Sequence, residues 1–171
     1  MQLRDGELEL RAWTMDDVPD LVEACNDPEI RHWIPVIPRP YTVEDARAFV
    51  RGEVASGQQQ FAIGENGRAV GSIGLSINEA FHNGHIGYWC APGARGRGVT
   101  TRALRLLCRH ALENLQLERL ELITDPDNHA SQRVAQKVGF QREGVLRSHL
   151  SHPDGRRRDS VMFSLLPGEL T

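Results

Sequence analysis

The sequence is poor in cysteine and has no surplus of positive charge. Its three cysteines, Cys25, Cys90 and Cys108, are scattered through 171 residues, and their spacing matches neither a metal site nor a disulfide framework. Lys and Arg number 20 against 23 Asp and Glu, a net charge of −3, which does not favour nucleic acid or an anionic membrane as a partner. We therefore expect a cytoplasmic protein with no bound metal, in which the thiols are small buried groups.

Long apolar segments are missing as well. No apolar run is long enough to span a bilayer, and residues 1–6 lack the basic-then-apolar pattern of a signal peptide. Hydrophobic residues make up 40% and charged residues 25% of the chain, a balance typical of globular domains. Because it has no linker, repeat or low-complexity segment, the chain is predicted to form a single domain over residues 1–171, with 8–166 as its folded core.

The hydrophobic pattern predicts a mixed α/β domain with many short strands. The expected strands cover 8–13, 60–63, 69–77, 85–90, 119–124, 141–150 and 159–165, and the expected helices cover 14–25, 42–57, 101–114 and 127–140. The segment 30–41 holds three prolines and is expected to be a loop, because prolines at that density prevent a regular helix. The order of strand 85–90, helix 101–114 and strand 119–124 implies a parallel strand pair.

The most informative stretch is 88–103, where an apolar strand turns through three glycines into a helix. The glycines are Gly93, Gly96 and Gly98. Backbone N–H groups at such a turn point in one direction without intrachain partners, which makes an anion site suited to a phosphate or pyrophosphate. Arg95 and Arg97 add positive charge beside it.

The sequence of this stretch can be compared with the patterns of three known phosphate-binding turns. A P-loop requires a lysine where Val99 stands, so chemistry on a γ-phosphate is not expected. A dinucleotide-binding turn requires a third glycine where Thr101 stands, although Asp125 after the next strand has the position of the ribose-binding acid. The third pattern, R/Q-x-x-G-x-G/A, is matched from Arg95 through Gly98, with Thr100 in the place of the small last residue.

A second motif lies at the expected distance from the first. It reads Asn128-x-x-Ser131-x-Arg133-Val-Ala-x-Lys137-x-Gly139-Phe140. With both motifs, the chain from 85 to 166 resembles the GCN5-related N-acetyltransferases, and among them the ribosomal-protein N-terminal (alanine/serine) acetyltransferase-like branch. The resemblance implies a twisted, mixed but mostly antiparallel sheet with helices on both faces, in which the parallel strands 85–90 and 119–124 splay apart.

The resemblance also implies acetyl-CoA as cosubstrate, with no metal. Its pantetheine arm would lie between the splayed strands. The residues implied to hold it are Trp89 and Cys90 through their backbone, Arg95, Gly96, Arg97, Gly98, Val99 and Thr100 around the pyrophosphate, and Asn128, Ser131 and Arg133 on the other wall.

The implied reaction is direct attack of an amine on the acetyl group. A backbone N–H near Cys90 would stabilise the oxyanion, and Ser131 is placed by resemblance as the general acid for the departing thiolate. The residues themselves single out no base. His149, Tyr88 and His85 are candidates, and an α-amine with an ordinary pKa of about 8 is already partly neutral near pH 7.

The acceptor is a primary amine, from a protein N-terminus or a small molecule. Trp33, Tyr41 and His149 are expected to form its walls. A monomer or a homodimer is expected. Two alternatives remain open at this point: an acyl-CoA-binding regulatory module without catalysis, and a nucleotide-dependent oxidoreductase.

Overall fold

The computed structural model describes residues 2–54 and 57–171. Its strands are β1 (Leu3–Asp5), β2 (Leu8–Arg11), β3 (Gln59–Glu65), β4 (Arg68–Asn78), β5 (Asn83–Cys90), β6 (Arg119–Thr124), β7 (Gln141–Ser151) and β8 (Arg157–Leu165). Its helices are η1 (Met15–Asp17), α1 (Val18–Cys25), α2 (Pro28–Trp33), α3 (Val43–Val50), η2 (Pro92–Ala94), α4 (Val99–Glu113) and α5 (His129–Val138). Within the described residues, no helix has the length and apolar character needed to cross a bilayer.

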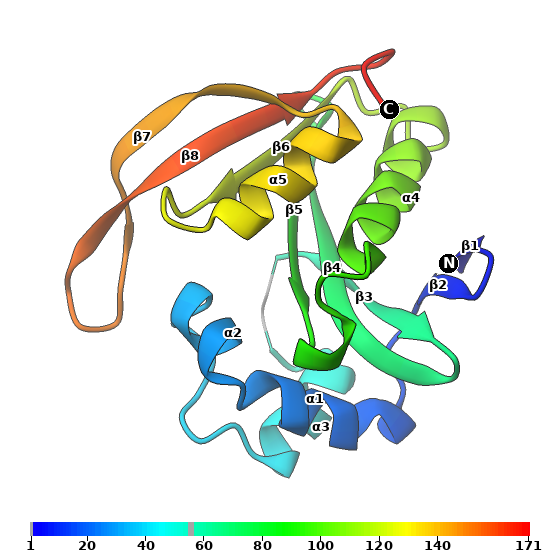
Figure 1. Ribbon diagram of the computed structural model, residues 1–171, viewed down its shortest axis with the longest axis vertical. Helices are drawn as coiled ribbons and strands as arrows, with labels where there is room; N and C mark the ends of the chain where they lie inside the picture. Colours follow the sequence, from blue (N-terminus) through cyan, green and yellow to red (C-terminus); the bar gives the residue numbers. More distant parts are fainter. Residues whose placement is uncertain (1, 55–56) are drawn as a thin grey trace.

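The strands form one mixed sheet. In the part of the chain that the structure describes, the sheet has eight strands in the order β1-β2-β3-β4-β5-β6-β8-β7. The β5–β6 pair is parallel and the other neighbours are antiparallel. Figure 1 shows the sheet bending so that β6, β7 and β8 lean away from β3 and β4. The predicted mostly antiparallel sheet with one parallel pair is confirmed.

The parallel pair splays apart. Its register runs from Asn83 opposite Arg119 to His85 opposite Glu121. Beyond these residues each strand stays paired with its outer neighbour, up to Cys90 on β5 and Thr124 on β6. The inner edges of β5 and β6 therefore face each other across a wedge that widens toward the glycine turn, as the resemblance implied.

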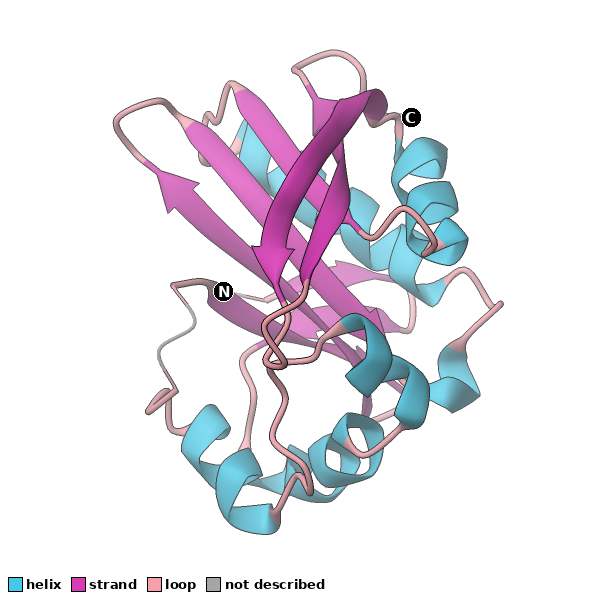
Figure 2. Ribbon diagram, turned by 90° about the vertical axis from the view of Figure 1, so that its left-hand side faces the viewer, coloured by secondary structure: helices cyan, strands magenta, loops and turns pink. Residues whose placement is uncertain are grey.

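Helices cover both faces of the sheet (Figure 2). Side chains alternate along a strand, so Ile86 and Tyr88 of β5 pack with the larger core beneath α4 and α5, while Trp89 packs with a second core. That second core joins α1 and α3 around Val18, Leu21 and Tyr41. The central strand thus separates two apolar compartments.

Local chemistry explains the elements that were predicted well. Asn66 and Gly67 link β3 to β4 with φ of 52° and 77°, the positive values that a tight hairpin turn requires. At the start of α3, the Thr42 hydroxyl accepts a hydrogen bond from the Asp45 N–H, and the Asp45 carboxylate accepts one from the Thr42 N–H. This helix ends at Val50, earlier than the predicted stop near Gly57.

The prediction of a continuous loop over 30–41 is wrong at its start, because α2 reaches Trp33. Asp27 caps this helix by accepting a hydrogen bond from the Ile30 N–H at 3.0 Å. Pro28 occupies the first helical turn, where a proline is tolerated because its missing N–H would have no partner. The remaining prolines follow α2 and end it. An Asp-Pro pair is the signal that identifies such a helix start.

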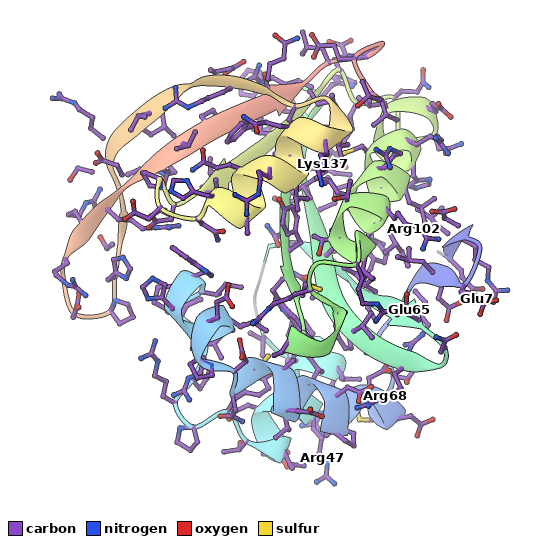
Figure 3. The ribbon with its side chains drawn as sticks, in the orientation of Figure 1. Glu7, Arg47, Glu65, Arg68, Arg102 and Lys137 are labelled. Carbon is purple, nitrogen blue, oxygen red and sulfur yellow. The ribbon has the colours of Figure 1, made fainter. Side chains whose placement is uncertain are left out.

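Two arginines of α4, Arg102 and Arg105, contact residues near the two ends of the chain. Arg102 donates to the Asp5 carboxylate at 2.8 Å, and Arg105 donates to the carbonyl of Thr171 at 2.5 Å and to that of Lys137 at 3.1 Å. Figure 3 shows Arg102 reaching from α4 toward the β1–β2 hairpin. These contacts give the two arginines a structural role in joining α4 to residues near both ends of the chain.

Candidate active site

The glycine turn leaves an open surface at the start of α4. Gly96 and Gly98 have φ of +71° and +78°, values that L side chains rarely adopt. A Cβ added at either would meet nothing within 4 Å, so both face open space, and both line a hollow of 330 Å³. Because Gly98 caps α4, the N–H groups of the first helical turn lie beside this hollow and suit an anion.

The two arginines of the turn, Arg95 and Arg97, form ion pairs with acidic residues of neighbouring elements. Arg95 forms ion pairs with Asp27 at 2.5 Å and Glu29 at 2.7 Å. Arg97 pairs with Glu65 at 2.6 Å, and Figure 3 shows Glu65 beside the turn. Acidic partners therefore match much of the positive charge that the sequence placed here. We infer that the backbone N–H groups, rather than these guanidinium groups, offer the main anion contacts.

The other wall of the hollow is α5. Asn128 caps this helix by accepting a hydrogen bond from the Ser131 N–H at 3.0 Å. Arg133 and Lys137 also line the hollow, and Figure 3 shows Lys137 on the side of α5 that faces α4. Lys137 was quoted in the sequence motif but not proposed as a ligand, although it lines the hollow together with Arg133.

Thr100 does not cap α4, because Gly98 is the capping residue and no side chain caps it. Its hydroxyl instead lies near the Cys90 thiol and favours the ionised form of that group. Burial raises the pKa of that thiol, although the Thr100 contact opposes the shift. Cys25 and Cys108 are buried, and burial raises the pKa of Cys25 to about 12. Thiols that remain protonated are poor nucleophiles.

The ladder of β5 determines which backbone groups face the wedge. The Ala91 N–H donates to the Val70 carbonyl at 2.9 Å, and Trp89 lies opposite Ser72 in the same register. Because antiparallel ladder bonds alternate, Trp89 directs its backbone groups toward β4, whereas Tyr88 and Cys90 direct theirs toward the wedge. Of the two backbone contacts implied for the cofactor, this orientation favours Cys90, although Trp89 also lines the hollow.

Tyr88 and Ser131 meet where two hollows join. The Tyr88 hydroxyl lies 3.1 Å from the Ser131 Oγ and donates to the Ser131 carbonyl at 3.2 Å. Both residues line the hollow at the glycine turn and a larger pocket of 760 Å³ on the other side. Burial raises the pKa of the Tyr88 phenol. The phenol therefore stays protonated near neutral pH and is a proton donor rather than a base.

The larger pocket lies against α1, α2 and α3. Trp33 and Tyr41, the aromatic residues expected in the acceptor wall, both line it. Trp33 also lines the hollow at the glycine turn, so α2 borders both chambers. Tyr41 is 8% exposed and belongs to the second core. It forms the back of the pocket rather than a mobile edge.

The two histidine candidates lie in different places. His85 lines the larger pocket, and its Nδ1 is 3.5 Å from the Gln58 amide nitrogen. Burial lowers the pKa of His85, so its imidazole is neutral at pH 7. His149 lies on β7 with its Nδ1 3.1 Å from the Ser160 hydroxyl, and it is not among the described residues that line either chamber.

Sequence reasoning missed the polar floor of the larger pocket. Gln58, Gln60 and Ser72 lie there beside His85. They come from β3, β4 and the segment before β3, so no local motif connects them. The acids that hold Arg95 were also missed, although the Asp27-Pro28 start of α2 was a local signal for one of them.

Comparisons with known proteins show which family the chain resembles. A family model described as an acetyltransferase (GNAT) domain matches residues 7–141. The chain is 28% identical over 170 residues to an uncharacterized N-acetyltransferase, p20, of Bacillus licheniformis, covering 95% of this chain and 94% of that protein. The solved structure of Mycobacterium smegmatis RimJ in complex with CoA-disulfide superposes with a TM-score of 0.84 and 26% identity, covering 99% of this chain and 87% of that chain.

Other relatives match over shorter segments. The ribosomal-protein-serine acetyltransferase of Escherichia coli is 31% identical over 109 residues, which is 61% of this chain and 61% of that protein. A Bacillus subtilis relative is 34% identical over 105 residues, and the chain spans 57% of its length. These alignments cover less than two thirds of the relatives, so they carry no substrate over to this chain by themselves.

Proposed function

The chain belongs to the acetyltransferase (GNAT) domain family, and on that premise we propose that it transfers an acetyl group from acetyl-CoA to a primary amine by direct attack. The observation that carries this proposal is the wedge between β5 and β6, which runs from the glycine turn to the Tyr88–Ser131 pair. A linear cofactor with a diphosphate at one end and a thioester at the other has the shape that this path requires. The oxidoreductase alternative does not fit, because the glycine turn follows five strands that pair antiparallel with one another, β1 to β5, instead of following the first strand of a strand–helix–strand unit.

In the proposed complex, the backbone of Gly96, Gly98 and Val99 binds the pyrophosphate, and Arg133 and Lys137 face it from α5. The pantetheine arm extends between β5 and β6, where the outward-facing backbone groups of Cys90 act as a replacement strand edge. Asn128 and Ser131 form the opposite side of the path. The acetyl group then lies beside Tyr88, at the junction with the larger pocket.

The amine nitrogen forms a bond to the acetyl carbon and generates a tetrahedral oxyanion. A backbone N–H directed into the wedge near Cys90 stabilises that charge. When the carbon–sulfur bond breaks, Ser131 donates its hydroxyl proton to the departing thiolate. Ser131 regains a proton from the Tyr88 hydroxyl 3.1 Å away, which takes up one from solvent in the same step, while the amine releases its proton to solvent. The proton that the amine loses balances the proton that the thiol gains.

The proposed mechanism does not require a strong base. Tyr88 stays protonated because burial raises its pKa, and His149 on β7 is not among the described residues that line the chambers. His85 remains as the imidazole within the larger pocket. An apolar pocket lowers the pKa of a bound amine because it disfavours the charged form, so the neutral nucleophile is the form that binds productively.

Calorimetric titration and a thiol-release assay test this proposal. Acetyl-CoA and CoA are titrated first, with NADH as the negative ligand, and thiol release is then followed over a panel of primary amines and short peptides. We expect acetyl-CoA to bind and thiol release to depend on an added amine. Tight acetyl-CoA binding without release on any amine would contradict catalysis and favour a regulatory acyl-CoA-binding module.

The proposed setting is the cytoplasm. The three cysteines are free thiols, which is typical of a reducing compartment. The net charge of −3 gives no general attraction to nucleic acid, so the proposed partner is the amine itself. That amine belongs to a protein N-terminus or to a small molecule.

A further inference from the structure

The lining of the 760 Å³ pocket restricts the acceptor further than the reaction does. We infer that the acceptor is a monoamine whose amine is attached to an apolar body, and that acceptors carrying a second charge are discriminated against. This inference rests on the acetyl transfer proposed above, because the pocket opens to the reacting atoms at Tyr88 and Ser131. It deepens that proposal by naming the chemical class of the substrate.

The walls of the pocket are apolar on several sides. The side chains that form them are Trp33, Ile34, Ile37, Phe49, Ile123 and Leu150. They come from α2, the segment after it, α3, β6 and β7, so apolar surface surrounds the space rather than covering one face. Behind them lies the second core, which includes Leu21 and Tyr41. A hydrocarbon body is stabilised when such a pocket removes it from water.

The carboxylates among the described lining residues already have hydrogen-bond partners. Asp125 pairs with Arg158 at 2.9 Å, and both side chains are 18% exposed. Asp45 accepts hydrogen bonds from the Thr42 N–H and hydroxyl at 2.8 and 2.6 Å, and its charge lies at the N-terminus of α3, where the helix dipole favours it. Both lining carboxylates therefore already accept hydrogen bonds from protein groups, which makes them weaker partners for a second ammonium group.

The floor is polar but carries no net charge. The Ser72 hydroxyl donates to Gln60 at 3.3 Å, the Gln60 amide donates to Gln58 at 2.8 Å, and the Gln58 nitrogen lies 3.5 Å from His85 Nδ1. Gly74 leaves space for these side chains, since a Cβ at this position would lie 2.7 Å from the amide groups of Gln58 and Gln60. The floor groups bond largely to one another. An added charge would lose its water without gaining an oppositely charged partner, which is costly.

Matched pairs of amines test the inference. Pentylamine is compared with 1,5-diaminopentane, and a C-terminally amidated Leu-Ala-Gly-Gly peptide is compared with its amidated Lys-first and Asp-first counterparts. The readouts are kcat/KM for thiol release and calorimetric affinity for the protein–CoA complex. We expect kcat/KM and affinity to be at least tenfold higher for the apolar member of each set. Whether pentylamine or the Leu peptide has the higher kcat/KM shows whether the acceptor is a small molecule or the N-terminus of a chain.

The two readouts separate this inference from the proposed reaction. If pentylamine or the Leu peptide binds the protein–CoA complex at least tenfold more tightly than its charged counterparts but no amine releases thiol, the substrate class stands and the transferase activity fails. If the diamine or the Lys-first peptide binds or reacts as well as the apolar member, the inference is overturned, whatever the overall rate.

A charge introduced into the floor gives a second test. Gln60→Glu keeps the size of the side chain and adds a carboxylate inside the pocket. Gln136→Glu adds the same charge at an exposed position of α5 outside the described lining and serves as the control. We expect Gln60→Glu to shift the ratio of pentylamine to 1,5-diaminopentane at least tenfold toward the diamine, while the control leaves it unchanged. A ratio that moves equally in both variants, or in neither, overturns the inference.

Discussion

At the scale of single residues, Ser131 is the group on which the proposed chemistry depends most. Its Oγ lies 3.1 Å from the Tyr88 hydroxyl, at the junction of the two chambers. General acid catalysis by a positioned side chain contributes roughly 100-fold to 10,000-fold to a rate. We predict that Ser131→Ala lowers kcat at saturating substrate by about 100-fold or more, with little change in acetyl-CoA affinity, as measured by thiol release and calorimetry.

Tyr88→Phe is the matched comparison, because it removes the partner hydroxyl and leaves Ser131 in place. We expect an intermediate loss of kcat for this variant. If Ser131→Ala turns over at the wild-type rate, the serine is a helix-start hydroxyl without a catalytic role, and the thiolate then leaves without its help.

Asp17 links the end of β2 to α1 and should make stability depend on pH. It is 3% exposed and pairs with Arg11 through hydrogen bonds of 2.7 and 2.8 Å. Burial opposes its ionisation, but the hydrogen bonds from Arg11 and Thr14 outweigh burial and hold the pKa of Asp17 below its ordinary value. The stabilisation is therefore present above the ordinary carboxylate pKa of about 4 and is lost as the pH falls below it.

We predict that Asp17→Asn reduces the free energy of unfolding at pH 7 by roughly 2 kcal/mol, below the usual range for a broken buried pair because Arg11 remains partly hydrated. Urea unfolding at pH 7 and pH 3 measures this difference. The variant should lose less stability than the wild type on acidification, while the exposed Asp16→Asn should behave like the wild type. An unchanged pH dependence in Asp17→Asn would contradict the assignment.

At the scale of elements, the turn from β5 into α4 can be tested with two glycines. Gly98 has a φ of +78° and lines the hollow, so a methyl group there strains the backbone by roughly 1–2 kcal/mol and enters the phosphate position. We predict that Gly98→Ala weakens acetyl-CoA binding about tenfold or more, a free-energy loss of roughly 1.4 kcal/mol or more. Calorimetric titration measures the loss.

Gly93→Ala is the control for this prediction. Gly93 belongs to the same turn, but its φ is not among the positive values, and a Cβ there would meet nothing within 4 Å. It also does not line the hollow. Acetyl-CoA affinity equal in Gly98→Ala and the wild type would show that the phosphate binds elsewhere.

Elements with strong local signals were predictable from the sequence, and elements defined by distant contacts were not. The Asn66-Gly67 turn and the cap at Thr42 each depend on residues within a few positions of each other, and so does the glycine turn. The helix α2 was missed because the density of prolines in 30–41 outweighed the Asp27-Pro28 start. The pocket floor was missed because Gln60, Ser72 and His85 are brought together only by the pairing of β3, β4 and β5.

At the scale of the whole molecule, the two halves of the sheet meet at the border between β5 and β6, where the strands pair over a short register. Strands β1 to β5 and strands β6 to β8 share a register only from Asn83 to His85 along their common border (Figure 1). A ligand that contacts the glycine turn on one side and α5 on the other therefore bridges both halves. Binding of the proposed cofactor should therefore stabilise the folded protein.

We predict that CoA stabilises the protein by more than its two parts do together. At 100 times its Kd, a ligand specific for the folded state adds about 2.7 kcal/mol, which for a chain of this size is a rise in Tm of roughly 5–10 °C. ADP reaches only the glycine turn and pantetheine only the wedge. At equal concentration, the rise in Tm with CoA should exceed the sum of the rises with ADP and with pantetheine. The two parts are covalently joined in CoA, so once one part has bound, the other binds intramolecularly. Thermal unfolding followed by circular dichroism measures all three. A rise with ADP as large as that with CoA would show that the wedge contributes no binding energy and would place the pantetheine arm outside it.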